Sequence, residues 1–372
     1  MGLTSQNLLL LLVFIAVAVC ALVLWLWPRA ARKGVLSWAA RLGMLVVAQV
    51  SVLAVLLVAA NNEFGFYSTW KELFGQNSSH QELQPGKEGE KRPPALVVKG
   101  QESVGLGPRE KGGQVDRISI HGPVTGLSMD GYAYLPPQYF QKGHEKDRFP
   151  VIVAVTGQPG VSRNLITQIK VPQAASKLVK ERKMRPTIVL MVRPSVVADR
   201  DTNCTDVPGG PQAMTFFNQD LPIAVNDKYR ADNSRGGWGA VGNSTGGYCA
   251  LKMAMTNPAR YGAGAGLSAD FFARQDRETG DLYAGSKQLK NEADLVWRLT
   301  HMPAPPVSLL VGVSKKGEEK YLKQAEHFAA KAKWPTKVEK LIRDEGGHNF
   351  QTWREEYPEV LRWLDKQLAD PR

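Results

Sequence analysis

The sequence is poor in cysteine and histidine, and it lacks the spacings that hold metal ions. It has 3 cysteines and 6 histidines among 372 residues, and none of them forms a C-x-x-C or H-E-x-x-H pattern. Those patterns are typical of redox-active pairs and zinc sites. We therefore expect no metal site.

The N-terminus lacks the positive charge with which a secretory signal peptide begins, because MGLTSQ contains no charged side chain. It leads instead into an apolar run over residues 7–27, and a second apolar run covers residues 43–60. A helix of about 20 apolar residues is long enough to cross a bilayer. We predict a hairpin of two transmembrane helices within residues 1–60.

The short loop between these two runs is basic, with Arg29, Arg32, Lys33 and Arg41. Short loops rich in lysine and arginine stay on the cytoplasmic side of a membrane. Both ends of the hairpin then face outwards. We therefore predict that the rest of the chain lies outside the cytoplasm and is held at the cell membrane by two spans.

The chain has an excess of positive charge but no pattern typical of nucleic-acid binding. Its formal net charge is +12 and its pI is about 9.5, yet the lysines and arginines are scattered and do not alternate with aromatic residues. A basic exterior suits the anionic surface of a membrane. This interpretation excludes nucleic acid as a partner and leaves acidic lipids open as substrates.

The chain after the hairpin changes in composition near residue 115. Residues 61–114 contain fragments such as PGKEGEKRPP and GPREKGG, which cannot form a packed core. We interpret them as an interfacial segment and a flexible linker. Residues 115–372 alternate strand-like and helical runs, and the middle strands are apolar on both faces, as helix-covered strands must be. This pattern predicts an α/β-hydrolase fold with a doubly wound, mostly parallel sheet.

Ser244 lies in the sequence GNSTG, between a strand-like run and a helical run. The Gly-x-Ser-x-Gly pattern in this setting presents a serine on a sharp turn between strand and helix. Serine is a weak nucleophile and needs a base, and that base needs a third group to orient it. We predict that Ser244 is the nucleophile.

In this fold the base follows the nucleophile in the chain, which leaves His301, His327 and His348 as candidates. His327 lies on the polar face of a helical run, and His301 lies in a loop directly before a strand. His348 follows the last strand in a Gly-Gly loop, where the backbone can bring it to the carboxyl edge of the sheet. We predict that His348 is the base.

The acid and the oxyanion donors are less directly indicated. The loop after the strand at residues 306–314 begins with lysines, so Glu318 and Glu319 are the nearest carboxylates; we choose Glu318 and keep Glu319 as the alternative. An oxyanion needs backbone donors. We nominate the N–H of Thr245, directly after the nucleophile, and the N–H of Gln158, in the loop after the strand at residues 150–157.

Two of the cysteines, Cys204 and Cys249, fall in the predicted external domain. An oxidising compartment permits a disulfide there, but two separate buried thiols agree equally well with the sequence. Cys20 lies inside the first predicted span.

Residues 115–372 resemble the esterase family that contains esterase D and the antigen 85 mycolyltransferases. The resemblance rests on AVTGQPG, DTNCTDVPGGPQAMTFFNQDLPIAV, GAVGNSTGGYCALKMAMTNPARYGAGAGLSADF and GGHNFQTWREEYPEVLRWL. It implies that Ser244 is the nucleophile and His348 the base of an acyl-enzyme mechanism without a cofactor, and that Cys204 pairs with Cys249. Lys315 departs from the family, because many relatives have an aspartate near that position.

These observations favour a membrane-tethered serine esterase acting on lipid or acylated envelope substrates. The alternatives are an acyltransferase with a sugar acceptor, like the mycolyltransferases, and a non-catalytic binding protein of the antigen 85 type. Residues 269–299 are an insertion between core elements that we expect to shape the substrate pocket, unless they form only a solvated loop. Nothing in the sequence indicates an oligomeric state.

Overall fold

The computed structural model describes residues 5–30, 34–64, 70, 94–197 and 200–369, and the chain divides into two compact units, Met1–Ser78 and Ser79–Arg372. The first unit holds α1 (Gln6–Leu26) and α2 (Val35–Phe64). By length and composition, both helices could cross a membrane. The second helix begins well before the predicted start at residue 43, because the preceding residues are mostly alanine, leucine and arginine, which favour helix.

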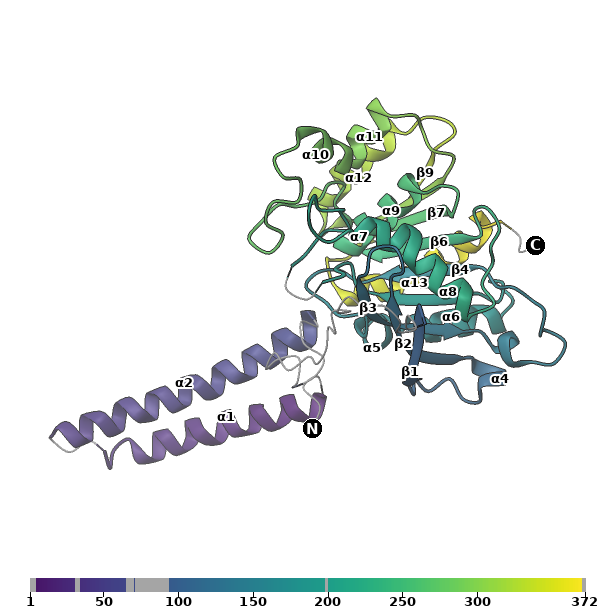
Figure 1. The fold of residues 1–372 in the computed structure, drawn as a ribbon. Helices are drawn as coiled ribbons and strands as arrows, with labels where there is room; N and C mark the ends of the chain where they lie inside the picture. Colours follow the sequence, from purple (N-terminus) through teal and green to yellow (C-terminus); the bar gives the residue numbers. More distant parts are fainter. Residues whose placement is uncertain (1–4, 31–33, 65–69, 71–93, 198–199, 370–372) are drawn as a thin grey trace, which may run out of the picture. The chain divides into compact units, whose positions relative to one another are not determined.

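The second unit is built on one sheet with the strand order β1-β2-β3-β5-β4-β6-β7-β8-β9 (Figure 1). The pairs from β1 to β5 are antiparallel, and the strands from β5 through β4 to β9 are parallel. This sheet confirms the predicted fold class. The strands are β1 (Leu96–Gln101), β2 (Gln114–His121), β3 (Ser128–Leu135), β4 (Val151–Val155), β5 (Ile188–Val192), β6 (Trp238–Asn243), β7 (Tyr261–Leu267), β8 (Ser308–Lys316) and β9 (Lys337–Glu345).

Helices cover both faces of the sheet. Ile152 and Ala154 of β4 belong to one core cluster, with side chains of α6 and α13, while Val151 and Val153 belong to a second, with side chains of α8, α9 and α12. Alternate residues of a strand point to opposite faces, so the apolar strands are buried from both sides. The longer helices are α6 (Val171–Lys180), α8 (Leu221–Lys228), α9 (Thr245–Thr256), α12 (Glu319–Lys331) and α13 (Phe350–Gln367).

Shorter helices lie in the connections, and two of them belong to the insertion at residues 269–299. They are α4 (Arg109–Gly112), η1 (Pro137–Phe140), α5 (Asn164–Thr167), α7 (Ala213–Thr215), η2 (Phe216–Asp220), α10 (Lys287–Ala293) and α11 (Leu295–His301). Figure 1 shows α11 beside α12, and α10 packs on α11. The insertion is therefore folded against the helix that follows β8.

The flexible-linker prediction is wrong for its last part. Residues 96–101 form β1, which pairs antiparallel with β2 from Leu96 opposite Ile120 to Gln101 opposite Asp116. The run Leu-Val-Val begins this strand and Leu96 is buried, but glycine, proline and charged residues around the run hide its strand signal. Residues 109–112 of the predicted linker form the short helix α4, and residues 71–93 of the predicted interfacial segment and linker lie outside the described residues.

A disulfide joins Cys204 to Cys249. Cys249 lies in α9, the helix that begins directly after Ser244, and both cysteines are fully buried. The bridge therefore fixes the segment around Cys204 to the helix behind the proposed nucleophile.

Replacing both Cys204 and Cys249 with alanine is expected to lower the free energy of unfolding by about 4 kcal/mol. The bridge spans a sequence separation of 45 residues, and its loss restores that loop's entropy to the unfolded chain. Denaturant unfolding of the full chain measures the change, with Cys20→Ala as the control. An unchanged midpoint in the double variant would show that the bridge does not stabilise the fold.

Candidate active site

Ser244 occupies the turn between β6 and α9 in a strained conformation, with φ 54° and ψ −126°. A residue other than glycine in such a region costs about 1–3 kcal/mol. The flanking glycines make the turn sterically feasible. A Cβ atom on Gly246 would lie 2.2 Å from the carbonyl oxygen of Val155, and one on Gly242 would lie 2.2 Å from the backbone of Gly246. The Gly-x-Ser-x-Gly pattern thus has the sharp geometry that its spacing predicts.

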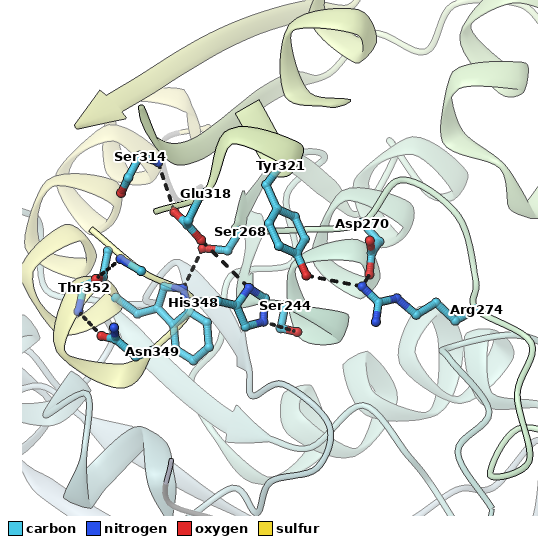
Figure 2. Close-up of polar contacts among 12 residues, drawn as sticks. Ser244, Ser268, Asp270, Arg274, Ser314, Glu318, Tyr321, His348, Asn349 and Thr352 are labelled. Carbon is cyan, nitrogen blue, oxygen red and sulfur yellow. Dashed lines mark hydrogen bonds and ion pairs between the residues drawn. The ribbon is translucent and has the colours of Figure 1, made fainter. Parts of the chain in front are cut away.

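His348 lies directly in front of this serine (Figure 2). Its Nε2 atom is 2.9 Å from the Oγ atom of Ser244. The imidazole stacks on the ring of Tyr321 with the centroids 4.9 Å apart, and it packs nearly perpendicular to the ring of Trp353 with the centroids 5.1 Å apart. Trp353 is fixed in turn, because its indole N–H donates to the Oγ atom of Ser268. The imidazole is therefore oriented from two sides.

Glu318 lies on the other side of the imidazole. Its Oε1 atom is 3.8 Å from Nδ1 of His348, within ion-pair range but longer than a hydrogen bond. The carboxylate is fully buried, and its Oε2 atom accepts a hydrogen bond from the backbone N–H of Ser314. Glu319 is exposed and accepts instead from the N–H of Gly317. The structure thus brings Glu318, and not Glu319, to the histidine.

The chain reaches this position because β8 extends to Lys316. Lys315 and Lys316 are still strand residues, and they pair with Asp344 and Glu345 on β9. Gly317 then turns the chain with φ 90°, where a Cβ atom would lie 2.0 Å from the carbonyl oxygen of Gly346. The strand therefore ends two residues later than predicted, and Glu318 follows the turn at Gly317.

The two segments that carry the nominated oxyanion donors both adjoin Ser244. Thr245 is the first residue of α9, and first-turn N–H groups have no partner inside their helix. A Cβ atom on Gly157 would lie 3.0 Å from Cβ of Ser244, so the loop containing Gln158 lies against Ser244. The roles of these two N–H groups stay predictions.

Tyr321, Arg274 and Asp270 belong to the same site and were not identified from the sequence. The Nη2 atom of Arg274 lies 2.6 Å from Oδ2 of Asp270 and donates to the hydroxyl of Tyr321 at 3.3 Å. Asp270 and Arg274 belong to the insertion, whereas Tyr321 belongs to α12. No local pattern in the sequence indicates that these residues meet.

Burial, together with the positive charge of Arg274, lowers the pKa of His348 to about 4. A general base must be neutral to accept a proton, so the rate falls as the pH falls through its pKa. We therefore expect the acid limb of kcat/KM to lie well below the pH of about 6.5 at which an ordinary histidine titrates. A pH profile of ester hydrolysis by the full chain measures this limb. A limb at the ordinary histidine value would contradict the low pKa.

Comparison with protein families finds one match that covers more than half of the chain. Residues 122–364 match the model of the family described as "Putative esterase". The chain is 24% identical over 251 residues to an uncharacterized protein of Corynebacterium glutamicum, in an alignment that covers 64% of this chain and 58% of that protein. It is 31% identical over 108 residues to S-formylglutathione hydrolase of Bos taurus, covering 28% of this chain and 38% of that protein. The chain thus spans less than two thirds of the length of each relative.

Solved structures with the same fold include S-formylglutathione hydrolase from Agrobacterium tumefaciens. That structure matches 73% of this chain and 99% of its own length, with a TM-score of 0.60 and 16% identity. The fluorophosphonate-binding serine hydrolase F of Staphylococcus aureus matches 68% of this chain and 98% of its own length, with a TM-score of 0.55 and 14% identity. At these identities, the matches establish the fold.

Proposed function

Since the chain belongs to this "Putative esterase" family, we propose that it is a serine esterase that is tethered to the membrane and acts outside the cytoplasm. The contact of 2.9 Å between Oγ of Ser244 and Nε2 of His348 carries this proposal. A nucleophile within hydrogen-bond reach of an oriented base is the arrangement that acyl transfer requires. The buried carboxylate of Glu318 completes the proposed triad.

In the first half of the reaction, Oγ of Ser244 attacks the carbonyl carbon of the ester while Nε2 of His348 takes the hydroxyl proton. Glu318 stabilises the imidazolium that forms. The N–H groups of Thr245 and Gln158 donate to the oxyanion of the tetrahedral intermediate. When the intermediate collapses, the alcohol leaves with the proton from His348, and the acyl group stays on Ser244.

In the second half, water attacks the acyl-enzyme and gives a proton to His348. The second tetrahedral intermediate releases the carboxylic acid, and the proton returns to Ser244. A sugar hydroxyl in place of water would transfer the acyl group instead, which is the alternative activity. A non-catalytic binding protein would have no need for the contact between Ser244 and His348, so this contact favours an enzyme.

The location outside the cytoplasm is supported by two features. The helices α1 and α2 are apolar enough to span a membrane, and the loop between them contains the basic residues Arg29, Arg32 and Lys33. The disulfide between Cys204 and Cys249 is typical of an oxidising compartment. A membrane position also suits esters of lipids or acylated envelope components as substrates.

Hydrolysis of p-nitrophenyl esters by the full chain in detergent tests the proposed activity, with acyl chains from acetyl to palmitoyl. The expected result is release of nitrophenolate that Ser244→Ala abolishes. An alkaline phosphatase fused to the C-terminus tests the location, because that reporter is active only outside the cytoplasm. A folded protein that turns over none of these esters would refute the activity, and an inactive reporter on stable, full-length fusion protein would refute the location.

A further inference from the structure

Arg274 places a partly exposed cation beside the proposed catalytic pair. Its guanidinium donates to the hydroxyl of Tyr321, whose ring stacks directly on the imidazole of His348 (Figure 2). The side chain of Arg274 is 47% exposed. After burial, its positive charge is the second cause that lowers the pKa of His348. The guanidinium therefore acts electrostatically on the imidazole that contacts Ser244.

Asp270 holds this guanidinium from its buried side. The carboxylate is only 7% exposed, and its Oδ2 atom lies 2.6 Å from Nη2 of Arg274. Among the residues that the structure describes, the hydrogen bond of this guanidinium to Tyr321 comes from Nη2, and Nε and Nη1 donate to no protein group. With the side chain about half exposed, these two groups are the ones left to meet a ligand. The negative charge of the pair is buried and the positive charge faces solvent.

The guanidinium is therefore held in place before a substrate arrives. Arginine presents a planar set of donors that matches a carboxylate or a phosphate, and such charge-assisted hydrogen bonds are about twice as strong as neutral ones. A side chain already fixed by Asp270 and Tyr321 also loses less conformational freedom on binding. The positive charge of Lys320 acts on Asp270 as well and further offsets its negative charge.

We propose that Arg274 is a specificity residue that selects esters bearing an anionic group, a carboxylate or a phosphate, near the bond to be cleaved. The inference rests on the proposed esterase function and names its substrate class. It also gives the insertion a role, because Asp270 and Arg274 both come from that segment.

Two matched substrate pairs test the proposal. In the first, p-nitrophenyl hydrogen glutarate is compared with p-nitrophenyl valerate, which places the anion on the acyl side. In the second, 1-butyrylglycerol 3-phosphate is compared with 1-butyrylglycerol, which places a phosphate on the alcohol side. The readout is the ratio of kcat/KM for the anionic ester to kcat/KM for the neutral ester, measured on the full chain in detergent.

In at least one pair, Arg274→Gln is expected to lower this ratio by about tenfold or more, the effect of losing a charge-assisted contact. Arg277→Gln is the matched control, since Arg277 is an exposed arginine of the same loop, and it should keep the wild-type ratio. Arg274→Lys keeps the charge but not the planar donors, so an intermediate ratio is expected. The lysine variant carries the test if the glutamine variant does not fold. Added salt should lower the wild-type ratio, because it screens exposed charges.

Three results would overturn the proposal. The first is a wild-type ratio in both pairs that salt does not change. The second is a ratio in both folded variants of Arg274 equal to that of the wild type. If these esters are hydrolysed and either result appears, only the anion preference falls. The third, a folded protein that hydrolyses none of the four esters, overturns the esterase function and the inference together.

Discussion

Replacing Ser244 or His348 with alanine is expected to lower kcat for ester hydrolysis by about 10⁶-fold. The serine supplies the attacking oxygen, and the histidine 2.9 Å away is the group that can take its proton. Neither residue works without the other, so the double variant should be no slower than either single variant. The measurement is the steady-state rate on a p-nitrophenyl ester, with circular dichroism to confirm that each variant folds.

Two other histidines provide matched controls for this prediction. His301 stacks on Trp297, and both His301 and His327 are exposed. Their alanine variants should hydrolyse the ester at the wild-type rate. If the effects of Ser244→Ala and His348→Ala multiplied in the double variant, the two residues would act independently, and the proposed pair would be wrong.

Glu318→Gln is expected to lower kcat by about 10⁴-fold. Glutamine has the shape of glutamate, and its carbonyl oxygen can still accept from the N–H of Ser314, which binds Glu318 now. It carries no charge, however, and therefore cannot stabilise the imidazolium of His348 in the transition state. KM should change little, because the interaction strengthens only as that charge develops.

Glu319→Gln is the control for this second prediction, since Glu319 is exposed and accepts from Gly317. It should leave kcat unchanged. A large loss of kcat in Glu319→Gln together with a small loss in Glu318→Gln would mean that Glu319, and not Glu318, is the acid. Small losses in both would mean that the base works without a carboxylate partner.

Local sequence patterns predicted the sharp turn at Ser244, the approach of His348 to it and most of the sheet. The turn at Ser244 is set by nearby glycines, so the pattern GNSTG contains the information that the geometry needs. The position of His348 follows from chain order and from the loop after the last strand. Both predictions depend on features within a few residues of the side chain concerned.

Contacts between distant segments could not be predicted in the same way. The choice between Glu318 and Glu319 depends on how far β8 extends and on the turn at Gly317. The pair of Asp270 and Arg274 meets Tyr321 only after the insertion packs against α12. The strand at residues 96–101 was missed because it is stabilised by pairing with β2, while its surroundings have the composition of a linker.

The most direct test of the account is covalent labelling of the full chain with a fluorophosphonate probe, followed by mass spectrometry of the modified peptide. Such probes react with a serine that a neighbouring base activates. If Ser244 and His348 form the proposed pair, the probe leaves one phosphonyl group on Ser244, does not label Ser244→Ala, and labels His348→Ala much less. A folded wild-type protein that takes up no probe, or a label on a different serine, would contradict it.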